Sequence, residues 1–121
     1  MDERQFEVIK KTNYALINIL VEKLDTHIAP AVKSELVLIA GGGEKNIIID
    51  LKKARYCDSS GLSAILVANR LCKNAGGIFV LTGLQAAVER LISISQLDTV
   101  LNITEDLDKA VEFIESKTGG K

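Results

Sequence analysis

The sequence is poor in the residues that metal sites and disulfide scaffolds need: it has two cysteines and one histidine. Cys57 and Cys72 stand among apolar neighbours, where a thiol behaves as a small hydrophobic side chain, so we expect both to be reduced and structural. The one histidine, His27, precedes a predicted helix in a polar stretch, which favours an exposed side chain over a catalytic base. With no second histidine and no Cys-x-x-Cys pair, neither a metal site nor a hydrolytic triad is expected.

An excess of charge of one sign is also lacking, because 15 Lys and Arg residues stand against 16 Asp and Glu, a formal net charge of -1. No net positive field is present to hold nucleic acid or an anionic membrane, so direct nucleic-acid binding is not expected. The apolar runs fall far short of the roughly 20 residues that cross a bilayer. Residues 1–4 lack the basic end and apolar stretch of a secretory signal, so we expect a cytoplasmic protein without membrane insertion.

What the sequence does contain is the composition of one folded domain. Of its 121 residues, 47% are hydrophobic and 26% are charged, enough apolar material for a core without disulfides or a metal. We expect the domain to span residues 1–117 and to be followed by a flexible tail at 118–121.

The pattern of apolar residues predicts an α/β fold. Two extended segments, 6–10 and 14–21, are joined by the polar pair Thr12-Asn13 and predict an antiparallel hairpin. Helical spacing is predicted for 29–40, from 58–61 to about 74, for 86–94 and for 106–116, and strands for 46–50, 78–81 and 100–103. The alternation of strand and helix predicts a mixed sheet, an antiparallel hairpin followed by parallel strands, with about four helices packed against it. The small residues Ala64 and Ala68 favour close packing of their helix on this sheet.

The segment Asn46 to Asp50 contains the continuous β-branched run Ile47-Ile48-Ile49, which predicts a central strand covered on both faces. It also resembles the strand that carries the phosphoaccepting aspartate of two-component receiver domains. A receiver needs an acidic pair after its first strand and a lysine near the end of a later one, whereas the first strands here end in Lys10-Lys11 and Val21-Glu22. We therefore favour a turn role for Asp50 and keep an aspartate switch as a third hypothesis.

The segment Asp58-Ser59-Ser60-Gly61-Leu62 lies between an extended stretch and a helix. Asp58 or Ser59 can cap the free N–H groups of the first helical turn, and Gly61 permits close approach of another backbone or of a ligand. The same helix start would also accept a phosphate, because free N–H groups and the helix dipole both favour negative charge there.

At this motif the sequence resembles the STAS family, and within it the small single-domain anti-sigma-factor antagonists. The likeness covers nearly the whole chain. It rests on the signature 58–62, on Leu24-Asp25 before the first helix, on the hydrophobic strand 46–51 ending in Asp-Leu, and on Gly76-Gly77, Val88 and Leu91. Two positions depart from the family: Glu22-Lys23 stands where relatives usually carry a glycine, and Ser95-Gln96-Leu97 replaces Ser/Thr-Gly-Leu. The second departure places Gln96 where a positive φ is expected.

The resemblance implies a partner switch rather than an enzyme. In the family, the unphosphorylated protein binds an anti-sigma factor that is also a serine kinase and so frees a sigma factor; the kinase reverses this by phosphorylating the antagonist, and a serine phosphatase restores it. The accepting hydroxyl falls on Ser59, and the implied partner-binding residues are Asp25, Asp58, Ser59, Ser60 and Gly61. No cofactor is implied, and we expect a monomer when the protein is free.

A different class of function is compatible with the same family. STAS domains also serve in transport and stress-sensing assemblies. The alternative hypothesis is therefore an unphosphorylated structural subunit of a lipid transport complex.

Overall fold

The computed structural model describes residues 4–118, and its centre is a five-stranded sheet. In chain order, the strands of this sheet are β1 (Phe6–Lys10), β2 (Ala15–Ile19), β4 (Ile47–Asp50), β6 (Phe79–Thr82) and β7 (Asn102–Thr104). A separate two-stranded sheet pairs β3 (Lys23–Leu24) with β5 (Tyr56–Cys57). The helices are α1 (Ala29–Gly41), α2 (Ser59–Asn74), α3 (Ala86–Ile94) and α4 (Leu107–Thr118).

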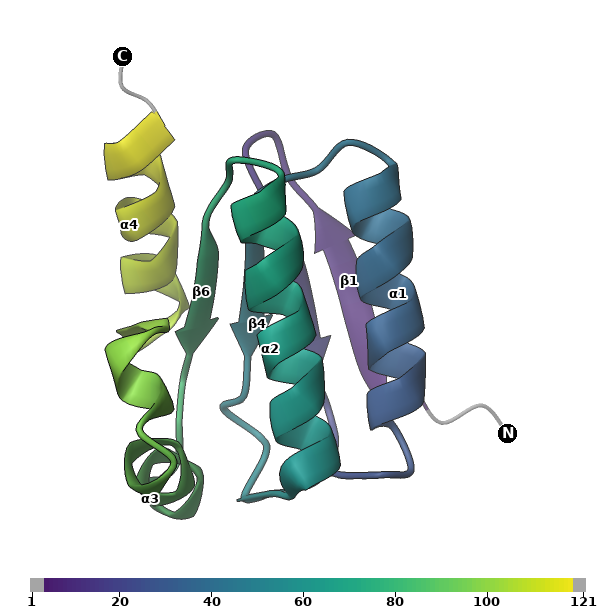
Figure 1. Ribbon diagram of the computed structural model, residues 1–121, viewed down its shortest axis with the longest axis vertical. Helices are drawn as coiled ribbons and strands as arrows, with labels where there is room; N and C mark the ends of the chain where they lie inside the picture. Colours follow the sequence, from purple (N-terminus) through teal and green to yellow (C-terminus); the bar gives the residue numbers. More distant parts are fainter. Residues whose placement is uncertain (1–3, 119–121) are drawn as a thin grey trace.

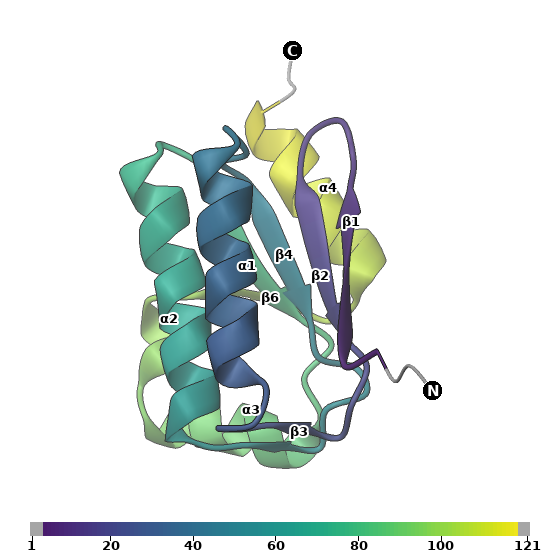
Figure 2. The ribbon, with the colours of Figure 1, turned by 90° about the vertical axis from the view of Figure 1, so that its right-hand side faces the viewer.

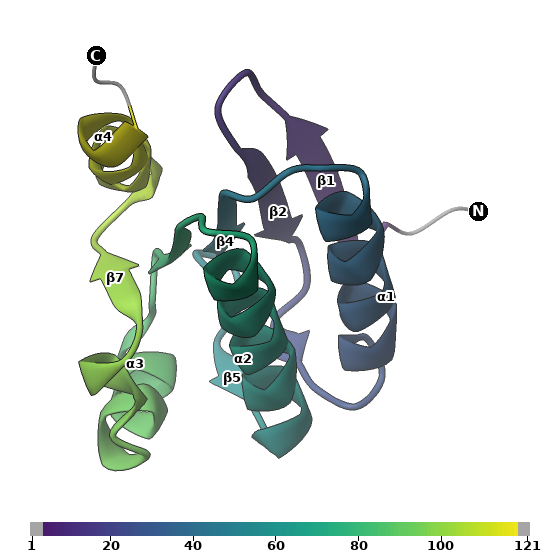
Figure 3. The ribbon, with the colours of Figure 1, turned by 45° about the horizontal axis from the view of Figure 1, so that its top comes forward.

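The central sheet has the order β1-β2-β4-β6-β7. β1 pairs with β2 in antiparallel fashion, while each later neighbour pairs in parallel. After the hairpin, each new strand is added on the same side of the strand before it. Because crossover connections between parallel strands are right-handed, the helices in these connections then lie on one face of the sheet. Accordingly, α1 and α2 lie side by side over one face, and α4 covers the other (Figures 1 and 2). Figure 3 shows β7 between α3 and α4.

The isoleucines of β4 show how the sheet is buried on both sides. Ile47 and Ile49 belong to the core under α1 and α2, whereas Ile48 packs in a second, smaller core with Ala110 and Ile114 of α4. All three isoleucines have 0% exposure. The β-branched run is therefore a central strand covered on both faces, as the sequence predicts.

The helices begin and end close to the predicted positions. α2 packs on the sheet through its smallest side chains, with Ala64 and Ala68 fully buried, as expected. Gln96 has a φ of 62°, the left-handed conformation expected at that position. α4 continues to Thr118, the first residue of the expected tail, and the rest of that tail lies outside the described residues.

The predicted hairpin, the parallel strands and the four helices are confirmed, and two strand boundaries are corrected. The strand predicted for 100–103 begins instead at Asn102, because Leu97–Thr99 form a 3₁₀ turn. In this turn the N–H groups of Val100 and Leu101 donate to the Leu97 carbonyl, which takes both residues out of the sheet. The hairpin strand predicted to reach residue 21 ends at Ile19, and a new short strand, β3, follows.

Candidate functional site

The serine motif lies at the junction of β5 and α2, and Asp58 determines where α2 begins. Asp58 has extended backbone angles, and its Oδ1 accepts a hydrogen bond of 3.0 Å from the N–H of Gly61. Its carbonyl accepts the N–H of Leu62 at 2.9 Å, the first bond of the helix. Of the two capping residues that the sequence allows, Asp58 is thus the cap, and Ser59 becomes the first helical residue.

Gly61 brings α2 into close contact with β3. Its Cα is buried, and a Cβ added there would overlap the carbonyl oxygen of Leu24 and lie 2.7 Å from the Sγ of Cys57. No side chain larger than hydrogen fits without moving the helix. Gly61 therefore positions the start of α2 from below the surface.

The small sheet explains how residues far apart in the sequence meet at this site. Leu24 is the register partner of Cys57 in the parallel pair β3–β5. Asp25 directly follows β3 and Asp58 directly follows β5, and the N–H of Asp58 donates to the Leu24 carbonyl at 3.4 Å. The carboxyl ends of parallel strands meet at one edge, so Asp25 lies beside the start of α2.

Asp25 is held in place by the turn that precedes α1. Its Oδ1 accepts the backbone N–H of His27 at 3.0 Å and lies 3.4 Å from the Nδ1 of the same residue. The backbone hydrogen bond from His27, more than the nearby charges of His27 and Lys23, lowers the pKa of Asp25 against a smaller opposing effect of burial. The His27 side chain itself is 85% exposed, in agreement with its predicted surface role.

The two serines differ in accessibility. Ser59 is exposed and Ser60 half-buried. Within residues 4–118 neither hydroxyl makes a hydrogen bond, and both backbone N–H groups occupy the first helical turn, where the helix offers no acceptor. Ser59 is thus the more accessible hydroxyl of the motif, next to a helix end that favours negative charge.

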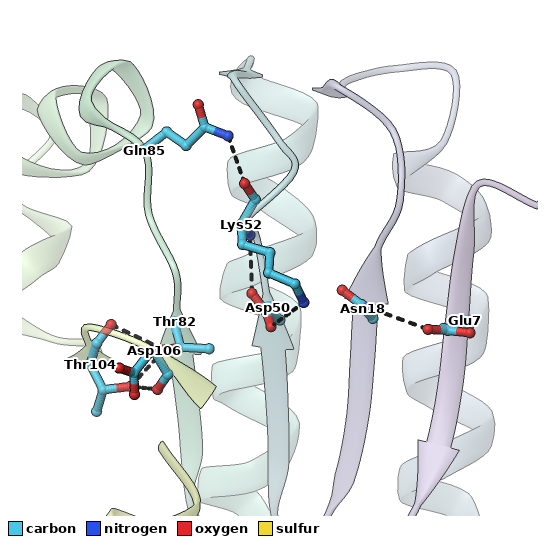
Figure 4. A network of polar contacts seen from close by, with 8 residues as sticks. All are labelled: Glu7, Asn18, Asp50, Lys52, Thr82, Gln85, Thr104 and Asp106. Atoms are coloured by element: carbon cyan, nitrogen blue, oxygen red, sulfur yellow. Dashed lines mark hydrogen bonds and ion pairs between the residues drawn. The ribbon is translucent and has the colours of Figure 1, made fainter. Parts of the chain in front are cut away.

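A row of polar side chains, which the sequence does not predict, runs across the whole central sheet. Consecutive members are register partners on neighbouring strands. We call them the polar row: Glu7, Asn18, Asp50, Thr82 and Thr104 (Figure 4). Asn18 donates to Glu7 at 3.0 Å, and the Thr82 hydroxyl donates to the Thr104 carbonyl at 3.1 Å. The signal in the sequence is a polar residue near the end of β2, β4, β6 and β7 and near the start of the antiparallel β1, which has meaning only once the register is known.

Asp50 is the centre of the polar row and holds the loop after β4. Its Oδ1 accepts the backbone N–H of Lys52 at 3.0 Å, and its Oδ2 lies 3.0 Å from Lys52 Nζ. The N-cap residue of α3, Gln85, donates to the carbonyl of the same lysine at 2.6 Å (Figure 4). Because the Asp50 side chain is only 3% exposed and both its oxygens are engaged, the structure favours the turn role over a phosphoacceptor.

The described residues offer little for metal or thiol chemistry. Between residues 4 and 118, no three side chains of His, Cys, Asp or Glu converge on a possible metal position. Burial raises the pKa of Cys57 and of Cys72 to about 12, so both thiols stay protonated at neutral pH. None of the helices in this part of the chain is both long and apolar enough to cross a bilayer.

The structure is thus a layered α/β domain with an exposed serine at the start of α2 and with Asp25 and Asp58 beside it. The family model described as STAS domain matches residues 6–110, and the chain belongs to the STAS domain family. The resemblance seen in the sequence is thereby confirmed.

The similar proteins include anti-sigma factor antagonists and a sulfate transporter family protein. The chain is 29% identical over 106 residues to the anti-sigma-B factor antagonist of Bacillus subtilis (strain 168), covering 88% of this chain and 95% of that protein. The structure of the anti-sigma factor antagonist SpoIIAA in its unphosphorylated form is similar with a TM-score of 0.72 at 18% identity, over 95% of this chain and 99% of that one. A sulfate transporter family protein from Wolinella succinogenes is similar with a TM-score of 0.77 at 17% identity, over 89% of both chains. At such identities the two structures establish a shared fold.

Proposed function

We propose that the protein is an anti-sigma-factor antagonist that binds an anti-sigma factor with serine kinase activity and thereby frees a sigma factor. The binding face comprises Asp25, Asp58, Ser59 and Ser60, with Gly61 holding α2 in place beneath them. The observation that carries the proposal is the exposed Ser59 hydroxyl at the start of α2, with Asp25 brought beside it by the β3–β5 pair. The protein acts in the cytoplasm as a binding module and as the substrate of its kinase, without a cofactor or catalysis of its own.

Phosphorylation of Ser59 is the proposed switch. Phosphoserine adds about -1.5 to -2 charges at neutral pH. Within the protein, the N–H groups at the start of α2 offset repulsion from Asp58, so folding stability changes by no more than roughly 1 kcal/mol. At the interface the phosphate must lose water against groups arranged for a neutral hydroxyl, which costs about 2 to 5 kcal/mol. Phosphorylation therefore releases the partner without unfolding the domain, and a serine phosphatase restores binding.

The first test is the position of the phosphate. The protein is incubated with the anti-sigma kinase of its own organism and ATP, and the product is mapped by mass spectrometry. We expect one phosphate on Ser59, no labelling of Ser59→Ala, and full labelling of Ser60→Ala. Phosphate at another residue, or full labelling of Ser59→Ala, would refute the assignment.

The second test is the effect of charge on binding, measured by calorimetry with the purified kinase. We expect Ser59→Asp to bind at least about tenfold more weakly, a loss near 1.4 kcal/mol, with unchanged circular dichroism and melting. Ser34→Asp is the matched control, because Ser34 is exposed in the middle of α1 and gains the same charge. Undiminished affinity of both Ser59→Asp and the enzymatically phosphorylated protein would refute the switch.

A second candidate function is favoured by the shared fold with the sulfate transporter family protein. In this alternative the domain is an unphosphorylated structural subunit of a transport complex, for which we consider lipid transport. Co-purification of transporter subunits from native extract, with no phosphate on the protein, would support it. An acid-labile phosphate on Asp50 would instead support the aspartate switch, whereas phosphoserine is stable in acid.

A further inference from the structure

The outward side of α1 differs from that of an ordinary surface helix. The helix is attached to the domain through Ala29, Val32, Leu36 and Ile39, which are all buried. On the opposite side, at about 100° per residue, six exposed residues form one continuous strip. We call this strip the α1 face: Pro30, Ala31, Ser34, Val37, Leu38 and Gly41. A surface helix usually turns charged side chains outward, whereas the α1 face has none.

The two largest side chains of the α1 face are well exposed. Val37 is 57% exposed and Leu38 is 68% exposed. The face also contains the small residues Ser34 and Gly41, which precede and follow this pair. Large side chains next to small ones form the ridges and grooves through which two helices pack. The α1 face therefore has the composition and relief of a helix–helix contact.

Two residues of opposite charge, Lys33 and Glu35, border the α1 face. They are two positions apart, about 200° around the helix, so they point away from each other within one chain. Glu35 lines a surface hollow with Phe6 and Val8, which places it on the β1 side of the helix. Lys33 therefore lies on the other side, toward α2, which packs against α1 (Figure 2).

Neither charge is compensated by its own chain. Within residues 4–118, Lys33 and Glu35 form no ion pair, and α2 contains no Asp or Glu that could reach Lys33. The hollow beside Glu35 also holds Arg4 and Glu7, which pair at 3.4 Å, so two carboxylates and one guanidinium leave it with a net charge of one negative unit. An ammonium group is therefore needed on the β1 side of α1 and a carboxylate on the α2 side.

We propose that the α1 face is the contact between two copies of this chain, with their α1 helices parallel about a two-fold axis. Such an axis places the β1 side of one helix opposite the α2 side of the other. Each Lys33 then faces Glu35 of the second copy, with a difference in height of only about 3 Å along the helices. An antiparallel pair would bring identical sides together and leave both charges without a partner. The uncharged face between them brings no like charges into contact.

The size of the α1 face determines how strong the pair is. A stable interface uses about 20–30 residues from each partner, whereas this face has six, so the dimer is weak and forms at high concentration. The sequence alone leads to the expectation of a monomer, because the face appears only once α1 is placed on the domain. Asp25 precedes α1 and lies beside the start of α2, so a parallel pair presents the Ser59 sites of both copies at the same end.

The experiment is sedimentation equilibrium of the whole chain from about 10 µM to about 1 mM, where weak pairs dissociate. Leu38→Lys places a charge in the α1 face. Ile94→Lys is the matched control, because Ile94 is 72% exposed on another helix, α3. Lys33→Glu and Glu35→Lys each destroy the charge complementarity, and the double variant Lys33→Glu/Glu35→Lys restores it with the signs exchanged. Circular dichroism and melting confirm that each variant is folded.

We expect the wild-type protein to dimerise, and Leu38→Lys and both single charge reversals to dimerise at least about tenfold more weakly. Ile94→Lys and the double variant should dimerise as wild type does. A wild-type monomer over the whole range would overturn the inference, and so would equal weakening by Leu38→Lys and Ile94→Lys. A double variant no better than the single reversals would overturn the parallel arrangement. Loss of kinase binding by Leu38→Lys in a protein that is always monomeric would assign the face to the kinase instead.

Discussion

Gly83 and Gly76 offer a paired test of how tightly the polar row is packed. Both glycines have a φ of +75°, so alanine meets the same backbone penalty at each. At Gly76, after α2, an added Cβ has no atom within 4 Å. At Gly83, after β6, it would lie 2.7 Å from Asp50 Oδ1 and 3.1 Å from the backbone nitrogen of Lys52. The difference between the two substitutions therefore measures the contacts with Asp50 and Lys52.

The magnitudes follow from these surroundings. An alanine in the left-handed region costs roughly 1–2 kcal/mol, partly offset by its smaller freedom in the unfolded chain, so Gly76→Ala should lose about 1 kcal/mol. Crowding a packed site costs about 1–3 kcal/mol more, so Gly83→Ala should lose about 2–4 kcal/mol. For 121 residues the entropy of unfolding is about 0.25 kcal/mol/K. The melting temperature should therefore fall by about 4 °C for Gly76→Ala and by about 8–16 °C for Gly83→Ala.

The assay is thermal and urea unfolding followed by circular dichroism, since the chain has no tryptophan. A second background tests the cause: with Asp50→Ala in place, the added penalty of Gly83→Ala should fall toward that of Gly76→Ala, because substitutions in contact are not additive. Equal losses at Gly76 and Gly83 in the wild-type background would refute the reasoning.

Further outcomes are expected around the serine motif. Asp58→Ala should lose about 1 kcal/mol of stability through loss of the cap, and Asp58→Asn, which keeps an acceptor, much less; equal losses in urea unfolding would exclude capping. Gly61→Ala should lose at least about 1 kcal/mol in the same assay, and unchanged stability would show that α2 can move away from β3 freely. The folded-state pKa of Asp25 is lowered, so its contribution is present above about pH 4 and lost as the pH falls further. The small difference in melting temperature between wild type and Asp25→Ala should therefore shrink below about pH 4, and a constant difference would contradict this. Iodoacetamide at about pH 8 should leave Cys57 and Cys72 unmodified in the native protein and label both in urea, and native labelling would show that the thiols are accessible.

The parts of the fold that the sequence predicts are those encoded by local signals. The continuous apolar run of β4 and the glycines after α1 each mark an element within a few residues. The β3–β5 pair could not be predicted in this way, because each strand has two residues and only their pairing identifies them. The family resemblance predicts Ser59 and Asp25 as site residues. The β3–β5 pair, which only the tertiary structure reveals, brings them together.

The polar row is a different kind of omission. Asp50 taken alone is a plausible turn residue, and the structure agrees, with Lys52 as its partner. Its alignment with Asn18 and Thr82 depends on the register of three strands separated by helices. Periodicity within one segment contains no information about register between segments, so the sequence could not reveal a buried polar layer.

The placement of α4 has a consequence for folding during synthesis. Leu16, Ile48 and Val80 lie on one face of the sheet and are covered by Ala110 and Ile114 from the last helix. A ribosome that has delivered β1 to β6 has therefore produced a sheet with one apolar face still open to water. Until α4 leaves the exit tunnel, this face can adhere to other nascent chains or to chaperones. Slow translation of residues 83–106 would lengthen this interval, whereas the face under α1 and α2 can close as soon as β6 has formed.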